Sequence, residues 1–545
     1  MHWNRLRVLF SAVLAAGLLA GCPTEPVELE SGAVIGLRQW SPSGSAEVFK
    51  GIPYAAPPVG DLRWQPPEPP AAWDGVRAAF VAGPACAQSA GTMSSSALFL
   101  PSPDPCEDCL TLNVWRPAEP SDEPLPVMVW IHGGSFESGT GAFPVYDGST
   151  FASKGMIVVT INYRLGSLGY LAHPALSAES PHGVSGNYGL LDQIAALQWV
   201  QDNAAAFGGD PDRVTVVGHS AGSMSVGFLL VSPLAEGLFQ RAIMQSGVPW
   251  PALPLRSSDP EVIPSAEVEG LAWAEALGVQ GDGPAAAEAL RALPTVEILG
   301  IEIDIDPWDF RFAFSPSVDG VVLPDQPLLM MQAGDFNRVP LLIGSTRDEA
   351  TVFMVGSNEF IRWRAAEYEA FVEDFLGIDA ASVLALYPPP SGFVFGGLNR
   401  LFSDFSMFAL SRTTAKFVAA QALPVYPYYF TLRPANVAGE ILGAHHGAEV
   451  PFVFDTLLPG SALTREDREL ARAMQGYWAR FIISGDPNGG EAPFWPPYDP
   501  ETDAYLELGS EIRVDSRQPS GPLDTLEAIL LRLNEDARAF TTATE

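Results

Sequence analysis

Short apolar stretches alternate along this chain with longer stretches whose apolar residues recur at helical spacing. Strands are expected at residues 47–54, 110–115, 127–131, 157–162, 214–217, 339–344 and 426–432. Helices are expected at residues 187–207, 223–231 and 465–483. Strands that alternate with helices indicate an α/β fold, in which helices cover both faces of a large, mostly parallel sheet. In such sheets the functional residues collect at the carboxyl ends of the strands.

Composition narrows the class of protein. Hydrophobic residues make up 47% of the 545 positions, which is enough for a large core. No internal repeat or low-complexity linker divides the chain, so residues 23–545 are expected to form a single domain. A formal net charge of −34 argues against nucleic-acid binding, because the phosphate backbone would be repelled.

The first 22 residues are typical of a targeting segment. Arg5 and Arg7 precede an apolar stretch at residues 8–20. The stretch ends in Leu19-Ala20-Gly21-Cys22, which resembles a bacterial lipobox and implies that Cys22 is acylated and becomes the mature N-terminus. No Asp follows Cys22, which by this resemblance favours the outer membrane of the cell envelope. No later stretch has 18 unbroken apolar residues, so the lipid anchor is the only expected membrane attachment.

The expected strand at 214–217 leads directly into Gly218-His219-Ser220-Ala221-Gly222. A Gly-x-Ser-x-Gly sequence between a strand and a helix is typical of a nucleophile elbow, which exposes the serine hydroxyl at the end of a strand. Ser220 is the candidate nucleophile. Serine needs a neutral imidazole, a carboxylate that orients it, and N–H donors for an oxyanion.

The oxyanion donors are expected from two places. Strand 127–131 is followed by His132-Gly133-Gly134-Ser135-Phe136, where glycines allow the main chain to approach a substrate carbonyl closely. The N–H groups of Gly134 and Ser135, together with that of Ala221, are the predicted oxyanion hole.

The base is predicted to be one of two adjacent histidines, His445 and His446, which follow a late strand. The imidazole of His219 is expected to point away from Ser220. The remaining histidines are assigned to the targeting segment, the oxyanion loop or a polar loop: His2, His132, His173 and His182. Adjacent histidines in a loop make a poor metal pair, and no further ligand at metal-binding spacing completes a site.

Two carboxylates compete for the role of the acid. Asp348 and Glu349 both follow the expected strand at 339–344, between serine and histidine in chain order. Chemistry alone does not choose between them. Three cysteines follow Cys22, namely Cys86, Cys106 and Cys109, so at least one thiol has no partner within the chain.

Together these residues resemble the type-B carboxylesterase and cholinesterase family of α/β-hydrolases, over nearly the whole mature chain. Further stretches that look like family signatures are residues 49–54, 107–114, 207–211 and 485–489. The family pattern Asp-Glu-small-x-x-Phe falls on residues 348–353 and implies Glu349 as the acid. The pattern His-Gly-x-Glu falls on residues 446–449 and implies His446 as the base. The resemblance also implies a Cys86–Cys109 disulfide, which leaves Cys106 over.

The chain departs from the family at three places. Ser135 stands where the family has a third oxyanion glycine, and His219 stands where a glutamate is usual. The Cys86–Cys109 loop contains Phe99 as its only aromatic residue, whereas cholinesterases have in that loop a Trp that stacks on quaternary ammonium. Choline esters are accordingly not the expected substrates.

The resemblance implies a serine carboxylic-ester hydrolase that acts through an acyl-enzyme and needs no metal or organic cofactor. The expected partners are small-molecule esters, short to medium and uncharged. The alternatives are a lipase that acts at lipid interfaces and a cholinesterase-like adhesion protein without catalysis; the complete set of catalytic residue types argues against the second.

Overall fold

The computed structural model describes residues 21–41, 44–89, 104–260, 262–300, 314–355, 362–457, 463–516 and 521–541. Residues 1–20 of the predicted targeting segment lie outside this part of the chain, as does the middle of the Cys86–Cys109 loop with Phe99.

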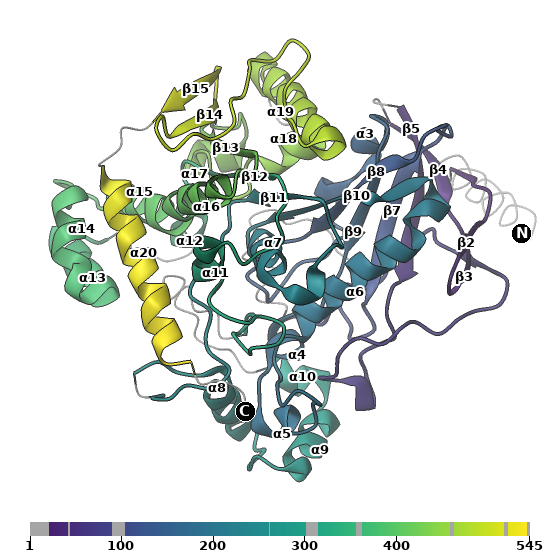
Figure 1. Ribbon diagram of the computed structural model, residues 1–545, viewed down its shortest axis with the longest axis horizontal. Coiled ribbons are helices and arrows are strands. Elements are labelled where there is room, and N and C mark those ends of the chain that lie inside the picture. Colours follow the sequence, from purple (N-terminus) through teal and green to yellow (C-terminus); the bar gives the residue numbers. More distant parts are fainter. Residues whose placement is uncertain are drawn as a thin grey trace, which may run out of the picture.

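Twelve strands form one large sheet at the centre of the molecule (Figure 1). In spatial order they are β1 (Cys22–Pro23), β4 (Leu37–Ser41), β5 (Gly44–Pro53), β7 (Thr111–Pro117), β9 (Ile157–Ile161), β8 (Leu125–Ile131), β10 (Gly209–His219), β11 (Arg241–Gln245), β12 (Leu341–Thr346), β13 (Val425–Phe430), β14 (Ala504–Leu508) and β15 (Ile512–Ser516). A small second sheet contains β2 (Val27–Leu29), β3 (Gly32–Ile35) and β6 (Val76–Ala78).

The pairing in the large sheet is mixed. The strands from β9 through β14 in the spatial order run parallel, whereas the outer strands on both sides pair antiparallel. The α/β class is confirmed, and the expectation of a parallel sheet holds for its central block. This block places the carboxyl ends of β8, β10 and β12 at one edge.

Helices cover both faces of the sheet. The longer ones are α6 (Tyr188–Asn203), α7 (Ala221–Val231), α8 (Ala266–Ala276), α9 (Pro284–Ala292), α13 (Ala365–Leu376), α15 (Phe395–Phe402), α16 (Ala409–Ala420), α19 (Arg465–Ser484) and α20 (Pro522–Ala539). The shorter ones are α3 (Ser149–Ala152), α4 (Gly166–Tyr170), α5 (Pro174–Ser177), α10 (Thr295–Ile298), α11 (Pro327–Ala333), α12 (Thr351–Val355), α14 (Ala380–Leu386), α17 (Val437–Leu442) and α18 (Val450–Phe454).

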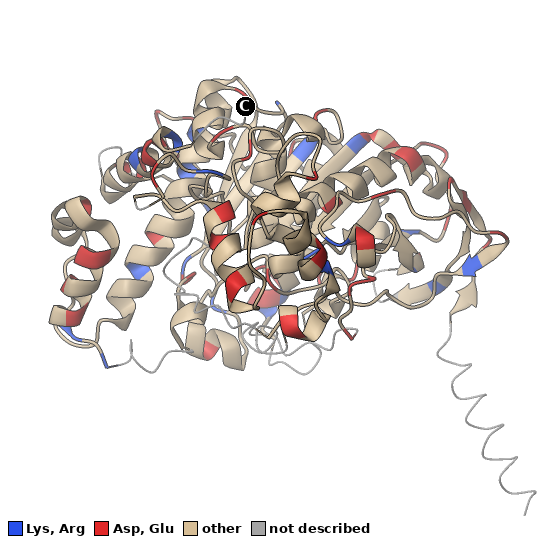
Figure 2. Cartoon of the chain, turned by 90° about the horizontal axis from the view of Figure 1, so that it is seen from below, with Lys and Arg blue, Asp and Glu red and all other residues tan. Residues whose placement is uncertain are grey.

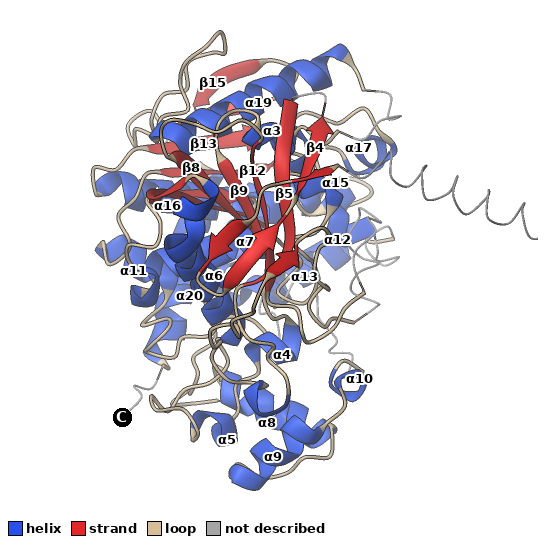
Figure 3. Ribbon diagram, turned by 90° about the vertical axis from the view of Figure 1, so that its right-hand side faces the viewer, coloured by secondary structure: helices blue, strands red, loops and turns tan. Residues whose placement is uncertain are grey.

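Two hydrophobic cores result, one on each face. Alternate residues of a strand point to opposite faces, so Val129 belongs to the core under α6 and α7, whereas Trp130 belongs to the core under α18 and α19. Figure 3 shows the strands enclosed between these groups of helices. The long apolar runs in β8 and β10 are explained by burial on both faces.

Local signals in the sequence set the ends of α19. At its start the Thr464 hydroxyl accepts a hydrogen bond from the Asp467 N–H, and the Asp467 carboxylate accepts one from the Thr464 N–H. At its end Gly485 has a left-handed conformation with φ of 81°, which a glycine adopts without strain. The expected helix at 465–483 is therefore present within one residue.

Candidate active site

Ser220 lies in the tight turn between β10 and α7. Its φ of 58° and ψ of −128° are strained values for a residue with a side chain. The two flanking glycines make this turn possible. A Cβ on Gly218 would lie 2.1 Å from the carbonyl oxygen of Gly222, and one on Gly222 would lie 2.1 Å from that of Ile131. The close packing of this turn holds Ser220 in its strained conformation at the carboxyl end of β10.

The loop after β8 packs directly against this turn. A Cβ on Gly133 would lie 2.8 Å from the Cβ atom of Ser220. Gly134, Ser135 and Phe136 all have positive φ, of 123°, 56° and 62°. Ser135 thus adopts the left-handed conformation that glycine favours, despite its side chain. In the described part of the chain, the N–H groups of Gly134, Ser135 and Ala221 donate no hydrogen bond, so they are free to bind an oxyanion.

His446 and Glu349 are hydrogen-bonded to each other. The Nδ1 atom of His446 donates to Glu349 Oε2 over 2.5 Å, and the backbone N–H of Thr346 donates to Glu349 Oε1 over 2.6 Å. Burial alone would lower the pKa of His446, but the charge and hydrogen bond of Glu349 and the charge of Glu449 outweigh burial and raise it. The Nε2 atom of His446 is buried and has no hydrogen-bond partner among the described residues.

Asp348 has a different set of partners. Its carboxylate accepts hydrogen bonds from the Ala444 N–H over 2.8 Å, from the Arg347 guanidinium and from the Asn399 amide. It thereby ties the end of β12 to the loop that carries the histidines. Of the two carboxylates that chemistry left open, Glu349 is the one that contacts His446.

His219 lies against the ring of His446. The two ring centroids are 4.6 Å apart, so the imidazole of His219 is in contact with the imidazole of the predicted base. His219 Nε2 is 3.9 Å from Oε1 of Glu449, a fully buried carboxylate at the start of α18. Sequence reasoning did not identify Glu449. Its signal was its place three residues after His446 in the His-Gly-x-Glu pattern.

The predicted disulfide between Cys86 and Cys109 is present, and Cys106 and Cys22 are free thiols. The disulfide lies close to the oxyanion loop, because Gln88 bonds both the N–H and the carbonyl of Gly139. In the described ranges no group of three or more His, Cys, Asp or Glu side chains is arranged to hold a metal ion.

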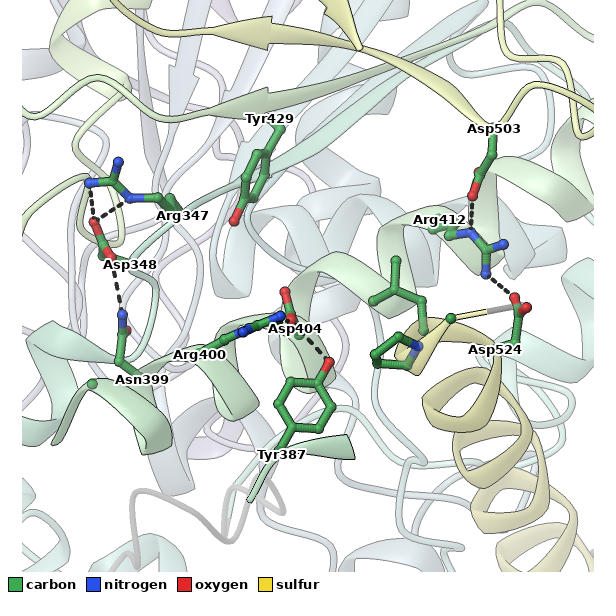
Figure 4. Close-up of a pocket in the computed structure, with 14 residues that line it drawn as sticks. Arg347, Asp348, Tyr387, Asn399, Arg400, Asp404, Arg412, Tyr429, Asp503 and Asp524 are labelled. Atoms are coloured by element: carbon green, nitrogen blue, oxygen red, sulfur yellow. Dashed lines mark hydrogen bonds and ion pairs between the residues drawn. The ribbon is translucent and has the colours of Figure 1, made fainter. Parts of the chain in front are cut away.

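A second feature is a cavity of about 730 Å³ that has Asp348 in its lining (Figure 4). Its charged side chains are paired with one another: Arg347 with Asp348, Arg400 with Asp404, and Arg412 with Asp503 and Asp524. Figure 4 shows Arg412 between Asp503, the residue before β14, and Asp524 of α20. Neither Ser220 nor His446 is among the residues that line this cavity, and its ion pairs connect residues of different elements.

Comparison with known proteins identifies the family of the chain. A sequence model described as the carboxylesterase family matches residues 23–380 and 391–523. The chain belongs to the carboxylesterase family.

Relatives of this carboxylesterase span nearly its whole length. It is 40% identical to a fumonisin B1 esterase of Sphingopyxis macrogoltabida, over 89% of this chain and 86% of that protein. It is 38% identical to a para-nitrobenzyl esterase of Bacillus subtilis, over 86% of this chain and 92% of that protein. It is 36% identical to a human cocaine esterase, over 93% of both chains. These matches identify the protein as a carboxylic ester hydrolase of the α/β-hydrolase fold.

Proposed function

We propose that this carboxylesterase cleaves esters through a covalent acyl-enzyme on Ser220. His446 Nε2 removes the proton of the Ser220 hydroxyl as its oxygen attacks the ester carbonyl, and the carbonyl oxygen becomes an oxyanion. Glu349 keeps the Nδ1 proton of His446 in place and stabilises the imidazolium that forms. The imidazolium then gives its proton to the leaving alcohol. A water molecule releases the acid by the same steps.

The N–H groups of Gly134, Ser135 and Ala221 are the donors for the oxyanion. All three are free of hydrogen bonds within the described part of the chain, and the turn that carries Ser220 packs against the loop that carries the first two. Donors fixed in advance need no reorganisation as the negative charge develops, which is why such groups lower the barrier.

The observation that carries the proposal is the His446–Glu349 hydrogen bond of 2.5 Å. It fixes the proton on Nδ1, so the second ring nitrogen is left as the acceptor. That nitrogen is the buried Nε2 atom without a partner among the described residues. A neutral imidazole with its acceptor nitrogen free is what activation of a serine requires.

The direct test is Ser220→Ala. We expect hydrolysis of ethyl butyrate to fall by on the order of 10⁴-fold or more, because the nucleophile is lost. The melting temperature should change little, since one hydroxyl is removed. The measurements are pH-stat rates and a thermal melt of the purified chain. Wild-type turnover in the alanine variant would refute the mechanism.

We propose further that the preferred substrates are short to medium, uncharged esters. The relatives are named for three chemically different compounds, namely fumonisin B1, para-nitrobenzyl esters and cocaine. The support is local: the Cys86–Cys109 loop has no Trp to stack on a cation, and His219 replaces a carboxylate. Burial and the neighbouring histidines hold the pKa of His219 well below its usual range, so its imidazole is neutral near pH 7.

A matched pair of substrates tests this preference. Acetylcholine and its neutral carbon isostere, 3,3-dimethylbutyl acetate, differ in charge and little in shape. We expect their kcat/KM values to agree within about tenfold, or about 1.4 kcal/mol. A larger preference for acetylcholine would mean that the site supplies a cation-binding face elsewhere.

We also propose that acylation of Cys22 anchors the mature enzyme to the bacterial cell envelope, with the outer membrane favoured. Cys22 is exposed in the short outer strand β1, where it pairs with Arg38 of β4. Its position at the sheet edge supports the proposal, because an acyl chain there leaves the core undisturbed. Among the described helices, none is long and apolar enough to span a bilayer.

A further inference from the structure

Two imidazoles and two carboxylates are buried together beside the nucleophile turn. Glu349 bonds His446, the ring of His446 packs on the ring of His219, and His219 Nε2 approaches Glu449 Oε1 to 3.9 Å. The mechanism above uses only the first pair. The second pair, His219 and Glu449, is joined to the first through the contact between the two imidazole rings and has no role in that mechanism.

The second pair is held in place from several elements. His219 is the last residue of β10, directly before Ser220. Glu449 Oε1 accepts a hydrogen bond from the Gln245 amide over 3.3 Å, and Gln245 Oε1 accepts one from the Trp478 indole over 3.0 Å. Gln245 also accepts the backbone N–H of Ser220 through its carbonyl, so one residue of β11 connects Glu449 to the nucleophile turn.

The turn after His446 is shaped to receive His219. Gly447 has a φ of 79°, and a Cβ there would lie 3.2 Å from Cε1 of His219. A side chain at position 447 would therefore press on that imidazole. Glycine at this position allows the histidine loop to close over His219 and keeps the two rings in contact.

The pair also has unused hydrogen-bonding capacity. Neither Nε2 of His219 nor Oε2 of Glu449 has a hydrogen-bond partner among the described residues, although both atoms are buried. A buried carboxylate with one oxygen that lacks a donor is costly as an anion and is stabilised by a proton. Nε2 of His219 lies 3.9 Å from the other carboxylate oxygen, Oε1, which is beyond hydrogen-bond distance.

We propose that His219 and Glu449 form a second imidazole–carboxylate pair that holds one exchangeable proton beside His446 and thereby sets the charge under which His446 works. His219 and Glu449 are positioning residues in this account, since neither touches the substrate. The inference rests on the proposed role of His446 as the general base.

Electrostatics of the cluster agree with a proton held near neutrality. Burial, followed by the negative charge of Glu349, raises the pKa of Glu449 to about 7. Burial, His446 and His445 hold the pKa of His219 well below its usual range. The phenols that face Glu449, Tyr146 and Tyr428, stay neutral because burial raises their pKa. Below about pH 7 the pair is thus uncharged, and above it Glu449 adds a second negative charge next to His446.

The consequence is a coupled titration. An ionised Glu449 favours the protonated form of His446, whereas a protonated Glu449 does not. The two groups then lose their protons in two overlapping steps that belong to the pair of sites. Because activity needs neutral His446, kcat/KM should rise with pH over a wider range than a single ionisation allows.

Two substitutions move this titration in opposite directions. Glu449→Gln removes the ionisable partner, so kcat/KM should follow a single ionisation whose midpoint is lower by about 0.5 pH unit or more. His219→Glu adds a carboxylate beside His446, so the midpoint should rise by about the same amount. In Glu449→Gln we also expect kcat to fall while KM changes little, because the imidazolium of the transition state loses a negative neighbour.

The experiment measures kcat/KM for ethyl butyrate in a pH-stat from pH 5 to 9, with thermal melts to confirm folding. Glu267→Gln is the matched control, because Glu267 is also buried but pairs with Arg256 of another region. Its profile should keep the wild-type midpoint and width. If His219→Glu does not fold, the width and midpoint of the kcat/KM profile of Glu449→Gln still decide whether Glu449 is coupled to His446.

A lower midpoint of the kcat/KM profile in Glu449→Gln together with a higher midpoint in His219→Glu would support the proposed pair. Profiles of Glu449→Gln and His219→Glu that superimpose on the wild type after scaling, or that shift in the same direction, would overturn it. This failure is distinct from failure of the proposed function, in which the wild type would not hydrolyse the ester or Ser220→Ala would retain its rate.

Discussion

At the scale of single residues, the adjacent carboxylates Asp348 and Glu349 show how position decides role. Both follow β12, but only Glu349 reaches His446, whereas Asp348 bonds the backbone of Ala444. Glu349→Gln should lower kcat/KM by roughly 10²–10⁴-fold, because the amide neither orients the imidazole correctly nor stabilises its positive charge. Asp348→Asn keeps a side chain of the same size and should cost less than about tenfold. The reverse ranking of the two rates would assign the acid to Asp348.

The pH dependence of activity belongs to this scale as well. The pKa of His446 is raised above its ordinary value, which for a histidine is about 6.5. Its neutral form is the active one, so kcat/KM should be lost as the pH falls through this raised pKa. A rate profile that stays flat down to about pH 4 would exclude a histidine base.

At the scale of elements, the sequence predicts best those strands that are buried on both faces. The expected strands at 127–131 and 157–162 appear as β8 and β9 within two residues at each end, because strands buried on both faces are almost wholly apolar. The expected helix at 187–207 is present as α6, which ends at Asn203, and the last four expected residues form a 3₁₀ helix before Gly208 in the left-handed conformation.

What the sequence could not predict depends on contacts between distant segments. The approach of His219 to Glu449 joins residues 230 positions apart, and nothing in the local pattern around either residue indicates it. The antiparallel pairing of the outer strands was not predicted for a similar reason, because pairing direction is set by the connections between strands and not by the apolar pattern. The choice of Glu349 and His446 came from the family resemblance, because spacing left Asp348 and His445 open.

At the scale of the whole molecule, acidic residues are spread over helices and loops on the face seen in Figure 2, and they outnumber basic ones. An excess of negative charge repels anionic lipids. Attachment to a membrane should therefore depend on Cys22.

In a Gram-negative host, Cys22→Ser should move the protein out of the membrane fraction and abolish labelling by a clickable palmitate. Retention in membranes after a salt wash would indicate a different anchor.

The central claim is that the hydroxyl of Ser220 forms the covalent intermediate. A fluorophosphonate probe tests it directly, because it reacts with an activated serine and leaves a stable adduct. We predict one adduct per wild-type chain, located by peptide mass spectrometry on the peptide that contains Ser220, with ester hydrolysis lost in proportion. Ser220→Ala should take up no probe. An adduct on another residue, or full activity in the labelled enzyme, would contradict the account.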